Sequence, residues 1–394
     1  MRPLPLHAAC AIALLALSAC TAPAAPPAQT ACQQTPCLRL IGEATLAHRW
    51  NFGGTTVGGL SGIDYDAAHD RFILLSDDRS NVDAARFYTA RIRYTASALA
   101  APEFTGVTTL QNAAGQPYAP RRRAPDGVDV PDPEAVRWLP GGDTLLWTSE
   151  GDFARGFGPA LRASRSADGA LLRDYALPAS FQPHPDKKAG PHDNDTLEGL
   201  TLMPDGRTAW LAMEGPWRQD GPRATPDSAG APVRITAIDV DSGRALRQIA
   251  YQPDAVPRAS PLPGGYTTNG VSEILADGPG HLLVLERSYT LGVGNSIRLY
   301  RIALAEGGDT LGLHALAPGN HTAVRKTLVA DFAHLGLAHV DNIEAMAWGP
   351  PLPGGGCVLV FVSDDNFNPA QVTQFIAAQY RAPGDRQGPC GAAR

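Results

Sequence analysis

The chain has 394 residues, of which 44% are apolar, and its formal net charge is −6. This length and apolar content are sufficient to bury a large core, whereas the acidic balance disfavours a nucleic-acid-binding surface. Glycine and proline are abundant, at 41 and 35 residues, and helical periodicity is scarce. The composition therefore favours an all-β fold.

The N-terminus has the features of an export signal. Arg2 precedes an apolar stretch over residues 8–17, which is too short to remain in a bilayer as a spanning helix. The tetrad Leu17-Ser18-Ala19-Cys20 resembles the lipobox of bacterial lipoproteins, so we expect residues 1–19 to be removed and Cys20 to carry lipid. An ordinary secretory signal cut nearby is the alternative.

We divide the exported chain into a tether and one domain. Residues 20–37 contain the lipidated cysteine and an Ala/Pro-rich segment that cannot form a core. Residues 38–394 are expected to form a single domain, which the lipid would hold at a membrane of the bacterial cell envelope, on the periplasmic side of the outer membrane. Secretion without an anchor is the alternative location.

Four cysteines remain in the exported chain besides Cys20, namely Cys32, Cys37, Cys357 and Cys390. An even number of cysteines in an oxidising compartment favours disulfides. The simplest pairing joins Cys32 to Cys37 and Cys357 to Cys390. A zinc site at the first pair is less favoured, because the sequence offers no matching His/Cys pair.

A short hairpin pattern recurs along the chain. Each copy has an acidic or hydroxyl residue, an apolar strand, a turn, a second strand and an acidic end. The copies begin at Ser61, Glu134, Glu198, Glu273 and Glu344. They lie roughly 70 residues apart, which is enough for four strands each, and regular repetition of four-stranded units indicates a β-propeller. We predict five blades, or six if one repeat has diverged, with the N- and C-terminal strands joined in one closing blade.

The propeller geometry predicts an acidic channel mouth. In an antiparallel hairpin the start of the first strand lies beside the end of the second, so five radial hairpins would gather their acidic ends on one face. The expected ring is Ser61, Asp77, Asp78, Glu134, Glu150, Glu198, Glu214, Glu273, Glu286, Glu344, Asp364 and Asp365. Mutual repulsion would raise some of their pKa values unless a cation compensates, and Ca²⁺ suits such oxygen ligands.

Arginines follow the acidic strand ends in four of the repeats: Arg79, Arg155, Arg218 and Arg287. They would either bind an anionic substrate through forked hydrogen bonds or pair with the neighbouring carboxylates. The alternative to a binding site is therefore a closed ring of ion pairs that only fastens the blades together.

Several runs resemble the bacterial family described as esterase-like activity of phytase. They are Asn194-Asp195-Thr196-Leu197-Glu198-Gly199-Leu200, Asp132-Pro133-Glu134-Ala135-Val136-Arg137 and Ser363-Asp364-Asp365-Asn366-Phe367. The resemblance covers most of the chain after about residue 40. It implies an exported propeller with phosphoester or ester hydrolase activity.

We therefore predict a metal-assisted hydrolase of a small anionic substrate such as a phosphoester, acting as a monomer. Glu134, Glu198 and Glu344 would position metal or water, and the four arginines would bind the anion. The predicted calcium ligands are Asp77, Asp78, Glu150, Glu214, Glu273, Glu286, Asp364 and Asp365. The alternative is a non-catalytic propeller that binds a ligand or an envelope partner and holds structural calcium.

Other residues are assigned simpler roles. Ser61 lacks the complete nucleophile-elbow motif, so we interpret it as a hydroxyl of the mouth. His184 and His192 lie in a polar loop that either covers the mouth or is merely solvated. Trp138, Trp147, Trp210 and Trp348 occupy apolar strand positions and are expected to pack between blades.

Overall fold

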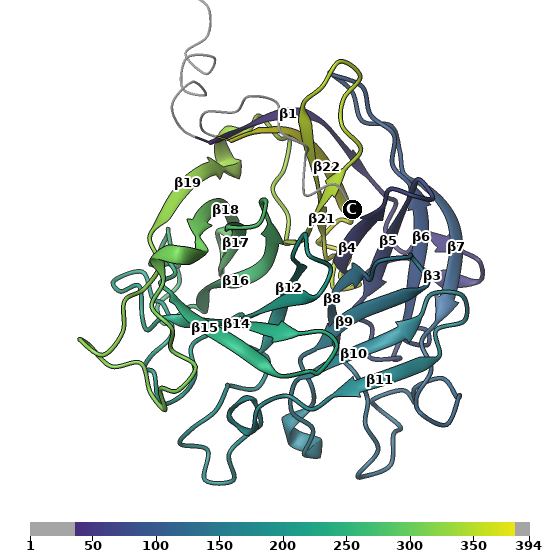
Figure 1. The fold of residues 1–394 in the computed structure, drawn as a ribbon. Coiled ribbons are helices and arrows are strands. Elements are labelled where there is room, and N and C mark those ends of the chain that lie inside the picture. The colour runs from purple at the N-terminus through teal and green to yellow at the C-terminus, as the bar shows by residue number, and fades with distance from the viewer. Residues whose placement is uncertain (1–35, 383–394) are drawn as a thin grey trace, which may run out of the picture.

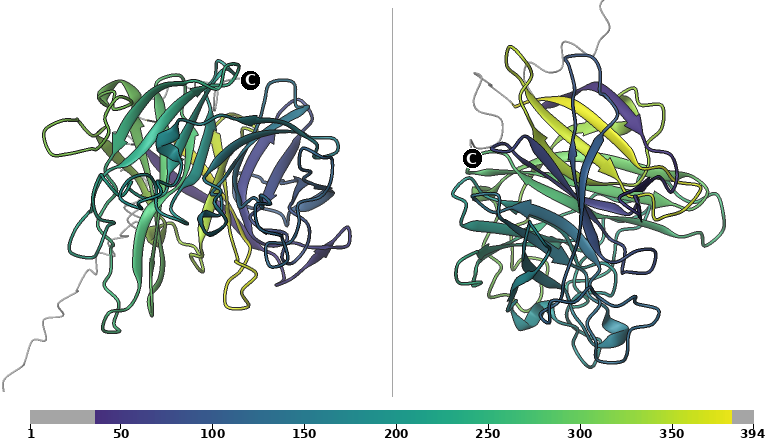
Figure 2. Two further views of the ribbon diagram at one scale, coloured as in Figure 1. Left: turned by 90° about the horizontal axis from the view of Figure 1, so that it is seen from below. Right: turned by 90° about the vertical axis from the view of Figure 1, so that its right-hand side faces the viewer.

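Five four-stranded antiparallel sheets surround a common centre in the computed structural model, which describes residues 36–382 (Figure 1). The innermost strands contact one another around the channel; they are β4 (Leu60–Asp66), β8 (Pro133–Trp138), β12 (Leu197–Leu202), β16 (Thr267–Ala276) and β20 (Ile343–Gly349). Figure 2 shows the same blades from two sides. The predicted five-bladed propeller is confirmed.

The first three blades are built from consecutive strands. Blade 1 contains β4 (Leu60–Asp66), β5 (Arg71–Ser76), β6 (Arg86–Arg91) and β7 (Glu103–Thr109). Blade 2 contains β8 (Pro133–Trp138), β9 (Thr144–Ser149), β10 (Ala160–Arg165) and β11 (Leu171–Tyr175). Blade 3 contains β12 (Leu197–Leu202), β13 (Thr208–Met213), β14 (Val233–Asp239) and β15 (Ala245–Tyr251).

The last two blades complete the circle. Blade 4 contains β16 (Thr267–Ala276), β17 (His281–Thr290), β18 (Gly294–Ala303) and β19 (Lys326–Asp331). Blade 5 contains β20 (Ile343–Gly349), β21 (Cys357–Ser363), β22 (Gln374–Arg381) and β1 (Cys37–Thr45). A two-stranded ribbon, β2 (Asn51–Phe52) and β3 (Thr55–Thr56), precedes blade 1. Short 3-10 helices occur at Phe153–Arg155, Ala179–Phe181, Leu304–Glu306 and Phe332–His334.

The two ends of the chain close the propeller in blade 5. Strand β1 pairs with β22 along its length, from Cys37 opposite Arg381 to Thr45 opposite Gln374. The side chains of Leu38 and Ile41 are buried beneath this pairing. The closure predicted from the sequence is therefore confirmed, and it covers an edge of β22 that would otherwise be open to other strands.

Apolar side chains fill the spaces between blades. Because each inner strand is covered on both faces, it is apolar without strict alternation, and β21 is buried along its whole length. Trp147 and Trp210 are buried in this packing, as expected. No helix in the described part of the chain has the length and hydropathy needed to cross a membrane.

Arg137 and Glu273 close the central channel. Both side chains are fully buried, and Arg137 Nη2 donates to Glu273 Oε2 at 2.7 Å. The same guanidinium donates to the carbonyl oxygens of Ile63 at 2.6 Å, Ile274 at 3.1 Å and Met346 at 3.3 Å. One arginine therefore contacts inner strands of three other blades and separates the two ends of the channel.

The structure tests only part of the cysteine predictions. Cys37 and Cys357 are both disulfide-bonded. Their predicted partners Cys32 and Cys390 lie outside the described residues, as does the predicted lipidation site Cys20, so the pairing and the lipid remain predictions.

Candidate metal centre

Each innermost strand carries a β-bulge at the same place near its start. The bulges leave Ser61, Glu134, Glu198, Ser272 and Glu344 unpaired, together with Ala135 in blade 2. A bulge redirects one side chain out of the regular alternation, and here it turns that side chain to the channel mouth. The repeat in the sequence therefore has a structural cause, which is one bulge in each blade.

In each blade a second residue faces the same mouth. It directly follows the residue of the second strand that pairs with the first strand just before the bulge. These residues are Asp77, Glu150, Glu214, Arg287 and Asp364. The mouth thus combines many carboxylates with two serines and one arginine. Blade 4 supplies Ser272 and Arg287, so it is the blade that contributes no carboxylate to the two sets.

Glu134 and Glu198 are buried without a counterpart. They are only 6% and 7% exposed, yet neither carboxylate accepts a hydrogen bond or forms an ion pair with any residue between 36 and 382. Burying an unpaired carboxylate costs free energy unless it is protonated or binds a cation. In the folded protein these two side chains are therefore either protonated or neutralised by a cation.

Two groups of ligand atoms lie at metal-binding separation beside these residues. The first group is Asp132, Glu134 and Glu150, and the second is Glu150, Glu198 and Glu214, with the ligand oxygens of each group within 4.8 Å of one another. All of these residues are buried. A set composed only of carboxylate oxygens suits a hard cation such as Ca²⁺ better than a softer metal.

Burial and mutual repulsion raise the pKa values of these carboxyl groups. Burial, followed by the charges of Glu198, Asp132 and Glu150, raises the pKa of Glu134 well above its ordinary value. The pKa of Glu198 is raised by burial and then by Glu150 and Glu214. Burial also raises the pKa of Asp132 to about 7, although Arg79 and Arg121 oppose the shift.

Arg287 compensates part of this charge on the other side of the mouth. Its Nη2 lies 2.8 Å from Glu214 Oε1 and 3.2 Å from Glu344 Oε1. Glu344 also accepts hydrogen bonds from Asn342 at 3.0 Å and Ser61 at 3.4 Å. Glu344 is therefore fully partnered, unlike the equivalent Glu134 and Glu198, and Ser61 serves as a hydroxyl donor at the mouth.

Asp77 and Asp364 complete the acidic half formed by blades 1 and 5. Asp364 accepts hydrogen bonds from Asn366 N at 2.7 Å and Asn342 Nδ2 at 3.3 Å. Burial raises the pKa of Asp77 well above its ordinary value, with the charges of Asp132 and Glu344 adding to the shift. Both residues lie close to Glu344, whose charge raises the pKa of each.

Two predicted calcium ligands lie elsewhere. Glu273 was aligned with Glu198, but the register places Ser272 at that position, and Glu273 instead pairs with Arg137 inside the channel. Glu286 lies one residue before the mouth position and contacts Lys326 Nζ at 2.5 Å and Tyr251 Oη at 2.6 Å. Both carboxylates already have their donors.

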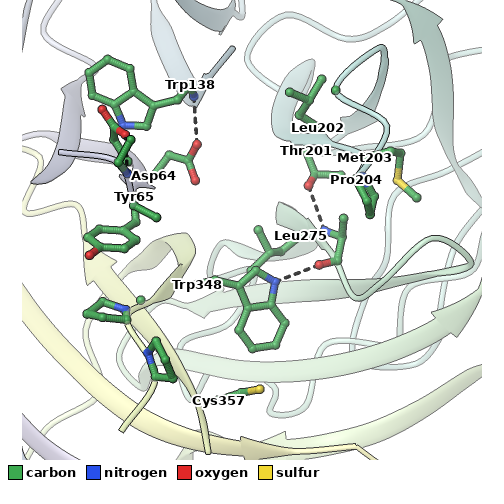
Figure 3. A pocket seen from close by; sticks show the side chains of 18 of the residues that line it. Asp64, Tyr65, Trp138, Thr201, Leu202, Met203, Pro204, Leu275, Trp348 and Cys357 are labelled. Carbon is green, nitrogen blue, oxygen red and sulfur yellow. Dashed lines mark hydrogen bonds between the residues drawn. The ribbon is translucent and has the colours of Figure 1, made fainter. Parts of the chain in front are cut away.

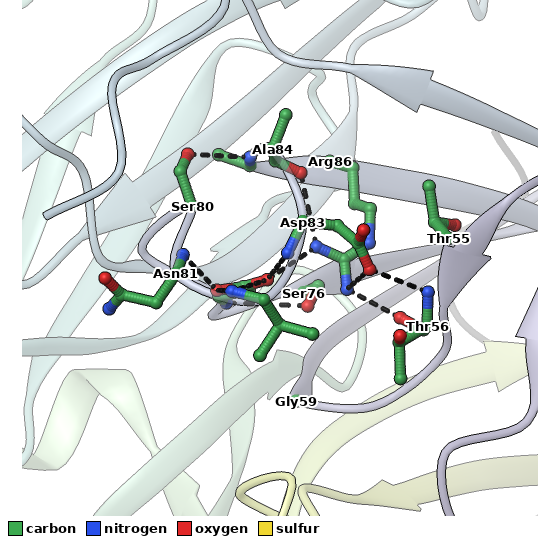
Figure 4. Close-up of polar contacts among 12 residues, drawn as sticks. Thr55, Thr56, Gly59, Ser76, Ser80, Asn81, Asp83, Ala84 and Arg86 are labelled. Atoms are coloured by element: carbon green, nitrogen blue, oxygen red, sulfur yellow. Dashed lines mark hydrogen bonds and ion pairs between the residues drawn. The ribbon is translucent and has the colours of Figure 1, made fainter. Parts of the chain in front are cut away.

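Asp78 and Asp365 stabilise loops behind the mouth. Asp78 accepts hydrogen bonds from the backbone of Asn81 at 2.8 Å and Asp83 at 2.8 Å, and it pairs with the buried Arg86 at 2.8 Å (Figure 4). Asp365 Oδ1 accepts from Gly59 N at 2.9 Å and Phe367 N at 3.1 Å. Their donors hold these side chains as loop supports.

The four predicted anion-binding arginines differ in availability. Arg79 bridges Asp132 and Asp152, each at 3.0 Å, Arg155 donates to the carbonyl oxygens of Pro125 and Val128, and Arg287 pairs with Glu214 and Glu344. Arg218 is the exception, since its guanidinium forms no ion pair or hydrogen bond within residues 36–382.

Arg218 belongs to a basic group at the rim of blade 3. Burial, together with the charges of Arg223 and Arg218, lowers the pKa of His192 to about 4. Arg223 pairs with Asp195, and burial and the charge of Glu214 raise the pKa of Asp195 to about 7. Arg218 and Arg223 thus lie near His192, and Arg223 connects this basic group to Asp195.

A protein-family model identifies the chain. The model for phytase-like proteins, described as esterase-like activity of phytase, matches residues 55–367. The chain belongs to this phytase-like family. No curated protein matches the sequence.

Solved structures similar to this phytase-like propeller are distant. A bifunctional GH43-CE protein of Bacteroides eggerthii has a TM-score of 0.43 and 8% identity, with 87% of this chain and 34% of that chain covered. The catalytic domain of the GH62 α-L-arabinofuranosidase of Coprinopsis cinerea has a TM-score of 0.40 and 9% identity, with 88% of this chain and 97% of that chain covered. A gluconolactonase of Xanthomonas campestris has a TM-score of 0.30 and 13% identity, with 91% of this chain and 98% of that chain covered. These scores are low, so the family match alone bears on function.

Sequence reasoning missed several residues of the phytase-like site. Asp132 lies two residues before Glu134, and Asp195 three before Glu198. Their position within the quoted family runs was a signal that they belong to the mouth. Arg121 pairs with Asp152 at 2.7 Å, and nothing in the repeat indicated that Arg137 would close the channel.

Proposed function

We propose that this phytase-like propeller is a calcium-dependent hydrolase of small phosphoesters or esters that acts at the acidic mouth. The observation that supports this proposal is the pair of buried, unpartnered carboxylates of Glu134 and Glu198. Asp132, Glu150 and Glu214 supply the further oxygens that would hold the cation. A bound Ca²⁺ would supply positive charge and lower the pKa of a coordinated water.

The protein side chains would perform the remaining tasks. Arg218 would bind the negatively charged group of the substrate, because no carboxylate within the described chain neutralises it. Arg287 would hold Glu214 and Glu344 ionised by pairing with both. His192, which is neutral at pH 7, would offer a hydrogen bond at the rim without repelling the adjacent arginines.

The test combines metal binding with turnover. We expect the purified protein to bind Ca²⁺ in a titration calorimeter and to hydrolyse 4-nitrophenyl phosphate, phytate or 4-nitrophenyl acetate, with the activity lost in chelator. Glu134→Gln and Glu198→Gln should abolish turnover, whereas Glu103→Gln, on the exposed face of β7, should not. Calcium binding without turnover of any ester would reject catalysis and favour a non-catalytic, ligand-binding propeller.

We further propose that the propeller is anchored by lipid on Cys20 in the bacterial envelope. Arg2, the apolar stretch and the lipobox-like tetrad support this location. Cells expressing the chain should incorporate labelled palmitate into it, and Cys20→Ser should remove the label. Labelling that persists in Cys20→Ser would reject the anchor.

A further inference from the structure

The inner hairpin of blade 4 extends further past its bulge than those of the other blades. In blades 1, 2, 3 and 5 the first two strands begin to pair directly before the bulge. In blade 4 the corresponding residue of β16 is Val271, and residues 267–270 pair with residues 287–290 of β17 beyond it. These four additional pairs, which we call the blade 4 wall, extend the hairpin by roughly 13 Å at about 3.3 Å per residue.

One face of the blade 4 wall is continuous with the candidate metal centre. Residues directly opposite each other in an antiparallel hairpin share a face, as do residues two apart in one strand. Gly270 lies opposite Arg287. Arg287 contacts Glu214 at 2.8 Å, and a Cβ added at Gly270 would lie 2.7 Å from Glu214 Cγ. Thr268 and Tyr289 form the pair two positions further out, so they lie on this same face.

Tyr266 adds a second aromatic ring to this face. It lies two residues before Thr268, and its carbonyl oxygen accepts a hydrogen bond from Leu291 N at 2.9 Å, so the pairing continues outward. The ring centroids of Tyr266 and Tyr289 are 6.3 Å apart, with an angle of 38° between the planes. Burial lowers the pKa of Arg287, but the surrounding charges, that of Tyr266 among them, raise it overall. Tyr266 therefore lies on the side of the wall that carries Arg287.

The opposite face of the blade 4 wall is covered by the chain itself. Asn269 and Thr290 are buried. Asn269 Nδ2 donates to the carbonyl oxygen of Asp254 at 2.9 Å, and Thr290 Oγ1 donates to that of Arg258 at 2.8 Å. The polar face therefore supports the hairpin, and the face that carries the tyrosines is left open to solvent.

The open face exposes a large amount of apolar surface beside the mouth. Tyr266 is 61% exposed and Leu291 is 39% exposed, while Tyr289 is partly exposed. Covering such surface is favourable by about 25 cal/mol per Å², and aromatic rings favour other rings as partners. Two aromatic rings and a leucine suit an aromatic group better than a sugar, because the hydroxyl groups of a sugar need several polar partners.

We propose that Tyr266 and Tyr289 bind an aromatic ring of the substrate, so that the preferred substrates are aryl esters or aryl phosphoesters. This inference rests on the proposed hydrolase function and specifies its substrate class. Tyr289 lies two strand positions, about 6.6 Å, beyond Arg287. A ring joined to a phosphoryl or acyl group at the mouth would therefore reach the tyrosines.

The test compares two phosphonates that cannot be hydrolysed, in the presence of calcium. Phenylphosphonate and methylphosphonate carry the same anionic group and differ in the ring. By calorimetric titration, the wild-type chain should bind phenylphosphonate about tenfold more tightly than methylphosphonate. Tyr266→Ala and Tyr289→Ala should each reduce this preference to about twofold and leave methylphosphonate affinity unchanged.

Two further variants serve as controls. Tyr289→Phe keeps the ring and should keep the preference. Leu328→Ala removes a side chain of β19 that is 48% exposed and lies outside the blade 4 wall, so it should change neither affinity. A variant that misfolds would weaken the binding of both phosphonates, whereas loss of the ring site weakens the binding of phenylphosphonate alone.

Equal binding of the two phosphonates by the wild-type chain, or a preference that persists when both tyrosines are alanine, would overturn the proposal. Failure of this inference can be distinguished from failure of the proposed function. A tyrosine-dependent preference without turnover of any ester would reject catalysis and retain the ring site. Turnover of aryl and alkyl phosphates with the same KM would reject the ring site and retain catalysis.

Discussion

The unpartnered carboxylates at the mouth make a prediction at the level of single residues. Replacing Glu134 or Glu198 by glutamine removes charge repulsion, so the unfolding midpoint measured in chelator should rise. The same change removes a ligand charge, so calcium affinity should fall by about tenfold or more. Calorimetric titration and thermal unfolding measure the two effects.

Glu103→Gln provides the matched control, because it removes a carboxylate from an exposed position of β7. It should change neither quantity. If Glu198→Gln lowered the chelator midpoint, the carboxylate would have an ion-pair partner in solution, and the proposed cation site would be rejected.

The raised pKa values predict how stability depends on pH. Asp132 and Asp195 have pKa values of about 7 in the folded protein, against an ordinary value of 3.8. The folded state therefore binds more protons, and the stabilisation, complete below about pH 4, is lost as the pH rises toward 7. In chelator, the free energy of unfolding should fall over this interval.

Saturating calcium should reduce this loss, because the cation replaces the bound protons, and calcium affinity should rise with pH. Denaturant unfolding at several pH values, with calcium and with chelator, measures both trends. Identical pH profiles under the two conditions would contradict the assignment of Asp132 to the cation site.

Residue-level prediction from sequence succeeded where the repeat is regular and failed where it shifts by one position. Glu134 and Glu198 were placed at the mouth because acidic residues open both repeats. In blade 4 the sequence reads Ser272-Glu273, and only the register shows that the bulge falls on the serine. The pattern of side-chain types cannot reveal which of two adjacent residues a bulge leaves unpaired.

At the level of elements, the bulges require close approach between inner strands. A Cβ added at Gly62, directly after the bulge of blade 1, would lie 2.6 Å from Glu134 O and 3.0 Å from Val136 N. Gly62→Ala should destabilise the protein by about 1–3 kcal/mol, because backbone atoms must move. Gly280→Ala, where the added Cβ meets nothing within 4 Å, is the control. Equal denaturation midpoints for the two variants would contradict this account.

A buried ionic network connects blade 4 to the end of blade 3. Lys326 of β19 contacts Glu286 at 2.5 Å and Asp254 at 2.7 Å, and Glu286 is 2% exposed. Lys326→Met should lower stability by about 2 kcal/mol, because a charged hydrogen bond is lost at a buried carboxylate. It should leave calcium affinity unchanged, since Glu286 does not face the mouth. If Lys326→Met lost calcium binding, Glu286 would be a calcium ligand after all.

For the whole molecule, the propeller and its closure could be predicted because both follow from repetition and from the need to cover strand edges. The cavity of about 1190 Å³ that Trp138 and Trp348 line, at the end of the channel opposite the mouth (Figure 3), could not be predicted. Trp138 and Trp348 occupy the same kind of apolar strand position as Trp147 and Trp210, and whether a ring packs or borders a hollow depends on how closely five blades approach. The distance between the blades depends on the assembled ring and on the side chain of Arg137 at its centre.

The closure of blade 5 yields a prediction for the entire ring. A chain that begins at residue 46 lacks β1 and leaves β22 with an open edge, together with the apolar surface that Leu38 and Ile41 cover. It should melt about 10 °C or more below a chain that begins at residue 36, and it should self-associate. Thermal unfolding and sedimentation velocity measure these effects.

A synthetic peptide of residues 37–45, with Cys37→Ser, should bind the open edge as an added strand and recover part of the lost stability. A peptide of the same composition in scrambled order is the control, because it cannot place Leu38 and Ile41 over the core. If the shortened chain stayed monomeric with an unchanged melting temperature, the ring would close without its first strand. The pairing of the two chain ends would then contribute little to holding the five blades, and with them the carboxylates of the mouth, in place.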